Sequence, residues 1–400
     1  MECKSAQSIS SRKIQIDPAQ LCKQCPGYPV TEDAALAISP SSSSFESFIH
    51  QESAYDTATE CSIRTTLDEF VSYHIQKQHP IALVTSGGTC VPLESHTVRF
   101  IDNFSVGQRG AASAEYLLER GYAVIYLFRK RSLEPYSRHC VSLAVPSSNI
   151  FDLLEIDAAG HTVVRSEMQS IATEMLRRWQ RIREERRYLS MPFTSVQEYL
   201  QLLRLHAQAV APAGARALLY LCAAVSDFYL PTEDRPTHKI QSAAGPLELK
   251  LSLVPKALKP LTQRWCPRAF IVSFKLETDP SLVLHKARGA LAKYSHSLVI
   301  ANLLETRRRE VWFVYPQPQQ PDSTDPELGT DLELEAVRPA AVGAASADSS
   351  LSAHGGIEHF ELNAESERKG DELERLIIER LVELHDAHMS PRANSESDAD

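Results

Sequence analysis

Short apolar runs alternate with amphipathic segments along most of this chain. The runs are five to eight residues long and consist largely of aliphatic and aromatic residues, which predicts strands buried on both faces. They cover residues 81–85, 122–128, 218–225, 269–274, 298–302, 311–315 and 357–362, and residues 247–253 alternate between apolar and polar. Between the runs, apolar residues recur at steps of three and four, which predicts helices over 66–78, 105–120, 166–188, 193–210, 255–264, 282–294 and 369–388. Because parallel neighbours need long crossover connections, this alternation predicts an α/β fold, a Rossmann-like and mostly parallel sheet with helices on both faces.

Three segments lack this periodicity. Residues 1–64 contain a serine-rich run and several prolines, which predicts a poorly ordered N-terminal extension. Residues 317–356 are rich in Pro, Ala, Ser and acidic side chains, which predicts a disordered insertion between two edge strands. We therefore expect one α/β domain over 65–316, completed by the final strand and helix at 357–390 and followed by an acidic tail at 391–400.

Composition and charge narrow the class of protein. The hydrophobic fraction of 43% and the 15 glycines among 400 residues exclude collagen-like and fully disordered chains. A net charge of -9 argues against a nucleic-acid partner, which would require a basic surface. The longest uninterrupted apolar run, Ala217–Val225, is too short to span a membrane, and residues 1–20 lack the apolar core of a secretory signal. We expect a soluble protein of the cytoplasm, or of cytoplasm and nucleus.

The eight cysteines are dispersed, and one CxxC pair stands alone. Cys22 and Cys25 have no second pair and no histidines at zinc-finger spacing, so reduced thiols are a simpler interpretation than a zinc site.

Glycines concentrate in two turns. Gly87 and Gly88 directly follow the first apolar run, where a parallel sheet binds its ligands. Neither the dinucleotide fingerprint nor a Walker A loop is present, and a lone Gly-Gly turn is more often structural. Gly107 and Gly110 lie where the next helix opens, with Ser105 as its expected cap; free N–H groups and the helix dipole make such an opening an anion site. Either the two turns form a nucleotide phosphate cradle, or Gly110 serves close helix-to-strand packing.

Four further polar residues are candidates for chemistry. Arg99 and Asn103 lie between the two glycine turns, where a guanidinium can bind a carboxylate or phosphate and an amide can donate and accept. Asp227 follows the small residues Ala223 and Ala224 at another strand end, a place for a base or sugar. Three of the four have a simpler alternative: a turn residue for Asn103, an exposed acid for Asp227, and a solvated surface charge for Lys239 on its polar stretch.

Taken together, these segments resemble phosphopantothenoylcysteine synthetase (phosphopantothenate–cysteine ligase) of coenzyme A biosynthesis. Six motifs carry the resemblance in order and spacing: Val84–Thr89, Arg99–Gly110, Ala223–Asp227, His238–Ile240, Phe274–Thr278 and Ala301–Asn302. The Phe-Lys-Leu-Glu-Thr form is similar to the eukaryotic, ATP-using branch. The resemblance covers about residues 65–316 with the last strand and helix, and it implies a small antiparallel dimerisation flap beside the sheet.

The resemblance implies a role for each matched residue. The triphosphate would be bound by Gly87, Gly88, Ser105, Gly107 and Gly110, the nucleoside region by Ala223, Ala224 and Asp227, and the base side by Phe274 and Asn302. Lys239 would neutralise charge as the phosphopantothenate carboxylate attacks the α-phosphate of ATP. Asn103 would hold the acyl-adenylate while the amine of L-cysteine displaces AMP, and Arg99 would contact the acid.

The family also implies Mg²⁺ on the pyrophosphate, with no metal ligands identified in the sequence, and a homodimer whose neighbouring subunit completes the site near Lys239. Other coenzyme A enzymes are further candidate partners. Two departures weaken individual contacts: Val106 stands where many relatives have Ser, and Cys90 where many have a basic residue. Two alternative functions remain: an NADP-dependent Rossmann oxidoreductase using Arg129–Arg131, and a non-catalytic scaffold of coenzyme A enzymes.

Overall fold

The structure, a computed structural model, describes residues 40–139, 150–242, 245–317 and 356–390. Contacts divide the chain into two units, Met1–Ser43 and Ser44–Asp400. Only residues 40–43 of the first unit, the start of a helix, are described, and all other described residues belong to the second unit. Most of the predicted extension, insertion and acidic tail, together with Cys22 and Cys25, lies outside the described residues.

One eight-stranded sheet organises the second unit. Its strands in spatial order are β14 (Ile357–Glu361), β13 (Glu310–Val314), β12 (Leu298–Leu303), β11 (Phe270–Glu277), β8 (Ala217–Leu221), β1 (Ile81–Ser86), β4 (Ala123–Arg129) and β7 (Tyr188–Phe193). The six strands from β7 to β12 run parallel, and β13 and β14 add antiparallel pairs at one edge. Numbered in chain order, the parallel strands have the sequence 3-2-1-4-5-6, the Rossmann order. The predicted mostly parallel α/β fold is therefore confirmed.

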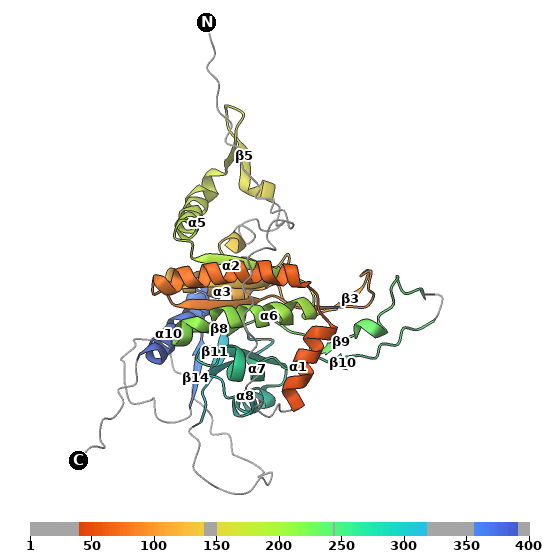
Figure 1. The fold of residues 1–400 in the computed structure, drawn as a ribbon. Helices are drawn as coiled ribbons and strands as arrows, with labels where there is room; N and C mark the ends of the chain where they lie inside the picture. Colours follow the sequence, from red (N-terminus) through yellow and green to blue (C-terminus); the bar gives the residue numbers. More distant parts are fainter. Residues whose placement is uncertain (1–39, 140–149, 243–244, 318–355, 391–400) are drawn as a thin grey trace, which may run out of the picture. The chain divides into compact units, whose positions relative to one another are not determined.

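Three small antiparallel pairs stand outside this sheet. They are β2 (Cys90–Pro92) with β3 (Phe100–Asp102), β9 (Phe228–Tyr229) with β10 (Ser252–Leu253), and β5 (Leu154–Ile156) with β6 (Thr162–Val164). In Figure 1 the β2–β3 hairpin and the β9–β10 segment extend from the same end of the sheet. We call residues 230–251, which connect β9 to β10, the flap.

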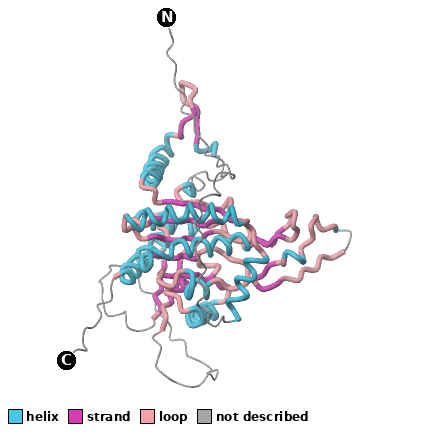
Figure 2. The backbone as a smooth tube through the Cα atoms, viewed as in Figure 1, coloured by secondary structure: helices cyan, strands magenta, loops and turns pink. Residues whose placement is uncertain are grey.

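Helices cover both faces of the sheet, as Figures 1 and 2 show. They are α1 (Pro40–Gln51), α2 (Thr57–Gln76), α3 (Gln108–Glu119), α5 (Ser166–Glu184), α6 (Val196–Val210), α7 (Leu258–Pro260), α8 (Pro280–Tyr294), α9 (Ala364–Arg368) and α10 (Leu373–Met389). Shorter helical turns are η1 (Ile150–Leu153), η2 (Ala211–Arg216), η3 (Thr232–Asp234) and η5 (Leu261–Trp265). Successive residues of β1 point to opposite faces: Leu83 packs in the core with α2 and α6, and Val84 packs in the core with α3 and α10.

Several predicted boundaries differ from the structure. Helices begin at residue 40, within the predicted extension, because Phe45, Phe48 and Ile49 of α1 are buried, with Phe45 edge-on to Trp265 at 5.0 Å. Strand β7 was not predicted, because it is a half-buried edge strand and Pro192 weakens its strand pattern. The run predicted at 218–225 leaves the sheet after Leu221, and residues 247–253 form a strand only at Ser252–Leu253.

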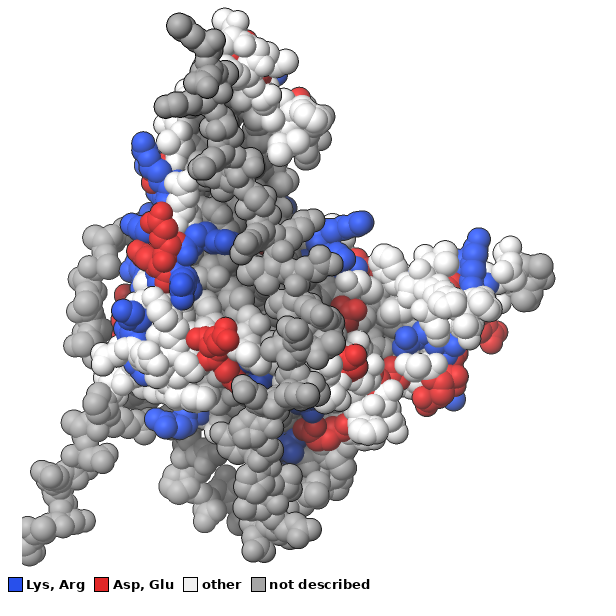
Figure 3. Space-filling view, turned by 45° about the horizontal axis from the view of Figure 1, so that its top comes forward, with Lys and Arg blue, Asp and Glu red and all other residues white. Residues whose placement is uncertain are grey.

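None of the helices in the described part of the chain is long and apolar enough to cross a membrane. On the face drawn in Figure 3, acidic and basic side chains gather in small groups beside one another.

Candidate functional site

The loops after β1 and β8 form the centre of the candidate site. These strands are neighbours, and the strand order reverses between them, which is where open α/β sheets bind ligands. Ala224 donates its N–H to Gly87 O at 2.8 Å, and Thr89 donates to Ala224 O at 3.0 Å. Thr85 Oγ1 accepts from Ala223 N at 3.1 Å, and Thr89 Oγ1 accepts from Ser226 N at 2.9 Å. The two loops therefore form one rigid floor at the carboxyl end of the sheet.

Each glycine of the first turn is required by a neighbouring protein segment. Gly87 has φ +81°, and a Cβ there would lie 2.5 Å from Arg129 Cβ. A Cβ on Gly88 would lie 1.6 Å from the backbone oxygen of Asn103. The N–H of Asn103 donates to Thr89 O at 3.1 Å. The first turn thus brings the segment carrying Asn103 against the floor of the site.

Arg129 fixes this turn from the neighbouring strand. Its Nη1 donates to Gly88 O at 3.0 Å and to Thr194 O at 2.9 Å, and it forms an ion pair with Asp102 Oδ1 at 3.2 Å. This guanidinium is therefore engaged in holding the protein together, which removes the reason to assign it to an NADP 2′-phosphate. From the sequence, Arg129 was a candidate only for that alternative, and its role at the glycine turn was not predicted.

The second glycine turn opens α3, but the helix starts later than predicted. Gly107, with φ +80°, occupies the N-cap position, so Ser105 is not the cap. Ser105 Oγ accepts instead from Gly107 N at 3.4 Å. The first N–H groups of a helix lack intrahelical partners and carry the positive end of its dipole. An anion bound here would be held by backbone N–H groups at the start of α3.

Gly110 allows α3 to pack closely against β1, which is the structural alternative that the sequence left open. Its Cβ would meet Ser86 Oγ at 2.4 Å and Ser86 Cβ at 2.5 Å, and a Cβ on Gly107 would meet Ser86 Oγ at 2.9 Å. At Gly87, Gly88, Gly107 and Gly110 alike, a side chain would clash with neighbouring protein atoms. The glycines allow α3 and the hairpin to approach β1 closely, and they do not themselves clear a void for phosphate.

Substituting Gly110 by alanine should destabilise the protein by about 1–3 kcal/mol, because Ser86 is fully buried and has no space to yield. Gly289, exposed in the interior of α8, is the matched control: apart from its chain neighbours and the backbone of its own helix, no atom lies within 4 Å of its Cβ position. Gly289→Ala should stabilise by about 0.5–1 kcal/mol, since alanine has the higher helix propensity. Urea unfolding of both variants measures the two changes in stability. Equal shifts of the unfolding midpoint would contradict the packing role of Gly110.

The predicted base side lies at the next two strand ends. Phe274 of β11 packs edge-on against Tyr220 at 5.0 Å, and Asn302 of β12 is buried. Arg109 of α3 lies beside Phe274 and α10, since its guanidinium is 5.9 Å from the Phe274 ring centroid and 3.3 Å from Glu374 Oε1. Burial raises the pKa of Glu374, and the charge of Arg109 opposes that shift. Arg109, which lies inside the second glycine motif, is a further site residue that sequence reasoning did not single out.

Asp227 lies at the surface, as its simpler interpretation as an exposed acid predicts. Its side chain is 67% exposed and forms an ion pair with Lys256 across the base of the flap. Ala223 and Ala224 are half-buried beside it. A ligand could rest on these small residues, but the carboxylate of Asp227 already has a cationic neighbour.

Lys239 and Arg99 lie away from the glycine turns. Asn103 is at the base of the β2–β3 hairpin, whereas residues 94–99 form its tip. The flap runs along this tip, since Ser95 N donates to Pro236 O at 2.9 Å and His96 N donates to Thr237 O at 3.0 Å. The tip is three or four residues beyond the base, about 10 Å at the usual rise of a strand. The structure therefore brings Asn103, Gly87 and Ala224 together. Lys239 and Arg99 lie apart from them, on an arm that consists of the hairpin tip (residues 94–99) and the flap.

Among the residues that the structure describes, no group of three or more His, Cys, Asp and Glu side chains is placed to hold a metal ion.

Comparison with known proteins identifies relatives of this chain. Residues 193–313 match the family model described as the DNA/pantothenate metabolism flavoprotein C-terminal domain. The phosphopantothenate–cysteine ligase of Homo sapiens is 47% identical over 240 residues, which are 58% of this chain and 75% of the relative. The phosphopantothenate–cysteine ligase 2 of Oryza sativa subsp. japonica is also 47% identical, over 262 residues that cover 64% of this chain and 79% of the relative.

A solved structure shares the fold. A mutant of Cab2, solved as a complex with phosphopantothenate–cysteine, has a TM-score of 0.69 at 34% sequence identity and covers 86% of this chain and 98% of its own. The similarity therefore extends over nearly the whole of that relative.

Proposed function

This chain belongs to the phosphopantothenate–cysteine ligase family and is a ligase of coenzyme A biosynthesis, and we propose that it activates 4′-phosphopantothenate with ATP as an acyl-adenylate. L-cysteine then displaces AMP to form the amide. The observation that carries the proposal is the meeting of the α3 start, the β1–β8 floor and Asn103 at one switch point. The relatives support the ligase and support neither an oxidoreductase nor a silent scaffold.

The α3 opening suits the triphosphate. Its N–H groups and dipole favour a polyanion, and the anion would lie beside the floor made by Gly87 and Ala224. From there the nucleoside reaches toward Ala223, and the base toward Phe274 and Asn302 at the adjacent strand ends. Ser105 lies at the same helix opening and is a candidate for a phosphate contact. Adenine in preference to cytosine is part of the proposal; use of a nucleoside triphosphate is common to the family.

Asn103 is suited to hold the activated acid. It is half-buried, and its backbone is fixed by the bond to Thr89 and by the close approach to Gly88. A carboxamide in this place can donate to an acyl oxygen and accept from an incoming ammonium or amine. We therefore assign Asn103 to the second half-reaction, in which cysteine attacks the adenylate.

Two copies of the chain would complete the site. Lys239 and Arg99 are carried on an arm about 10 Å from Asn103, and large apolar side chains are exposed on the same arm. They include Val98, 56% exposed, and Leu247, 51% exposed. Apolar groups in such numbers mark an interface, so we propose a homodimer in which the arm reaches the partner's α3 opening. Lys239 would then offset the charge that develops during attack on the α-phosphate, with Arg99 near the substrate carboxylate.

Mg²⁺ would accompany the nucleotide. When bound to the phosphates, it neutralises the pyrophosphate leaving group. The protein's own contribution is the N–H array of α3 and the cation of Lys239. We propose no side-chain ligand for the ion.

The two departures from the family pattern have local explanations. Cys90 is buried and donates its N–H to Thr194 O at 3.1 Å, and burial raises the pKa of its thiol. It is a neutral packing residue, while Arg129 supplies the nearby positive charge. Val106 is 49% exposed, so its side chain is available to an interface or a ligand but offers no hydrogen bond. A cytoplasmic location, with or without a nuclear fraction, and association with other coenzyme A enzymes remain proposals.

A matrix of nucleotides with and without cysteine tests the function. Purified full-length protein is incubated with 4′-phosphopantothenate, Mg²⁺ and ATP, CTP or NADPH. We expect AMP, pyrophosphate and phosphopantothenoylcysteine in stoichiometric amounts only when both ATP and cysteine are present. Release of ADP, or no nucleotide turnover at all, would overturn the proposal, and equal turnover with CTP would overturn its adenine preference.

A further inference from the structure

A buried carboxylate at the tip of the β2–β3 hairpin has no role in the proposed chemistry. Glu94 follows β2, and its side chain is fully buried although the loop around it is exposed. We propose that Glu94 is a positioning residue that clamps Arg99 and the Lys239 segment into one rigid arm. This inference rests on the proposed roles of Lys239 and Arg99.

The two oxygens of Glu94 bind the two segments of the arm. Oε2 accepts from Arg99 N at 2.9 Å and from Val98 N at 3.2 Å. Oε1 accepts from Arg99 Nη1 at 2.8 Å and from Ile240 N at 3.4 Å. Arg99 Nη1 also donates to Ile240 O at 3.3 Å. Glu94 therefore contacts Arg99 directly and fixes the backbone of the residue that follows Lys239.

These bonds keep Glu94 charged and oriented. Hydrogen bonds, chiefly from the backbone of Arg99, lower the pKa of the Glu94 carboxyl despite its burial. An ionised carboxylate accepts hydrogen bonds only, which matches the four donors around it. A neutral amide in its place would turn one N–H group toward another donor and leave the Arg99 charge without its counterion.

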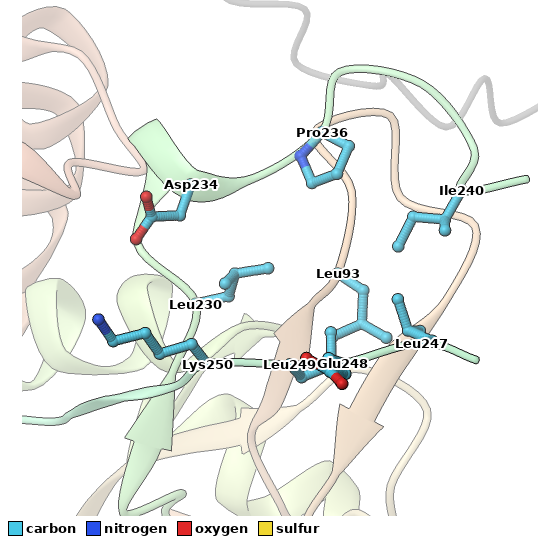
Figure 4. A pocket seen from close by; sticks show the side chains of 9 residues that line it. All are labelled: Leu93, Leu230, Asp234, Pro236, Ile240, Leu247, Glu248, Leu249 and Lys250. Carbon is cyan, nitrogen blue, oxygen red and sulfur yellow. The ribbon is translucent and has the colours of Figure 1, made fainter. Parts of the chain in front are cut away.

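A cavity lies beside the same junction. The cavity has a volume of about 330 Å³ and is lined by Leu93 of the hairpin together with flap residues, among them Ile240, Leu247 and Leu249, as Figure 4 shows. Leu247 is 51% exposed and Leu249 39% exposed. The backbone bonds from Ser95 to Pro236 and from His96 to Thr237 also join hairpin and flap, and Glu94 adds side-chain bonds to both segments at the positions that carry Arg99 and Lys239.

The arm carries one cation on each segment, so its geometry sets where both cations meet the substrate. Lys239 is exposed and adjoins Ile240, and the Arg99 guanidinium donates to the same Glu94 oxygen, Oε1, that accepts from Ile240 N. Displacing a catalytic group by about 1 Å can cost on the order of 100-fold in rate. Loosening the clamp should therefore slow activation of the acid while leaving the nucleotide floor intact.

Glu94→Gln tests the proposal in the full-length protein. We expect kcat for pyrophosphate exchange to fall about 10- to 100-fold and KM for 4′-phosphopantothenate to rise, with KM for ATP within about twofold of wild type. Glu94→Asp, which keeps the charge, should recover part of the rate. Glu115→Gln is the matched control: Glu115 is a buried carboxylate paired with Arg138 at 2.8 Å, remote from the arm, and its loss should lower stability without changing either KM.

The outcomes separate this inference from the proposed function. Wild-type rates in Glu94→Gln would overturn the clamp, as would a loss of kcat with both KM values unchanged, which is the signature of a smaller folded fraction. A rise in KM for ATP equal to that for the acid would also overturn it. If the wild-type protein itself shows no exchange, the proposed function fails first. Nucleotide binding by Glu94→Gln, measured by calorimetry with ATP, confirms that the variant is folded.

Discussion

Replacing Lys239 by alanine is expected to slow both pyrophosphate exchange and formation of phosphopantothenoylcysteine severely. The expected loss is about 10²- to 10³-fold in kcat, since a preorganised cation is removed from the place where negative charge develops on the α-phosphate. Binding of ATP should change little, because the nucleotide lies on the α3 opening and the β1–β8 floor. Exchange of radiolabelled pyrophosphate into ATP, with 4′-phosphopantothenate present and cysteine absent, measures the first half-reaction.

Lys250→Ala is the matched control for this variant. Lys250 is an exposed lysine of the same flap, and it lines the cavity on the flap side of the junction. Its removal should leave exchange within about twofold of wild type, as expected for a solvated charge. Equal losses in the two lysine variants would show that general flap charge matters and would contradict a specific role for Lys239.

Replacing Asn103 by alanine is expected to separate the half-reactions. Pyrophosphate exchange should persist within about tenfold, because Asn103 acts after adenylation, while product formation should fall about 10²- to 10³-fold. The backbone contacts of Asn103 with Thr89 and Gly88 do not involve its amide side chain, so the fold should be retained. Rapid quench with excess enzyme should reveal an accumulated adenylate. Equal losses of exchange and product would contradict this assignment.

The same two variants test whether the site is shared between copies. If Lys239 of one chain serves the Asn103 site of the other, each mixed dimer contains one intact and one doubly defective site. Random mixing would then restore about a quarter of wild-type activity, because half of the dimers are mixed and one of the two sites in each mixed dimer is intact. Mixtures no more active than the separate variants would show that each chain completes its own site.

Much of the fold was predictable because apolar runs record burial directly. β1, β4, β8 and β12 are buried along most of their length, so each stood out as an uninterrupted apolar segment. β7 was missed because a half-buried edge strand carries no such run. α1 was missed because its serine-rich start resembles a loop, and only its packing against Trp265 and other distant residues stabilises it.

The candidate site was predictable in location but not in the roles of its glycines. The position of Gly87 and Gly88 after the first strand indicates the carboxyl edge of the sheet. It does not reveal that the Asn103 backbone and Arg129 occupy the space beside them, because those contacts come from elements distant in sequence. Glu94 was invisible for the same reason, since its partner at Ile240 lies well over a hundred residues away.

The fate of an isotope in the substrate carboxylate tests the central claim most directly. 4′-Phosphopantothenate labelled with ¹⁸O in its carboxylate is turned over with ATP and cysteine, and the nucleotide and phosphate products are analysed by mass spectrometry. Attack of the carboxylate on the α-phosphate predicts one ¹⁸O atom in each AMP and none in pyrophosphate. Label in inorganic phosphate together with formation of ADP, or unlabelled AMP, would contradict the acyl-adenylate mechanism.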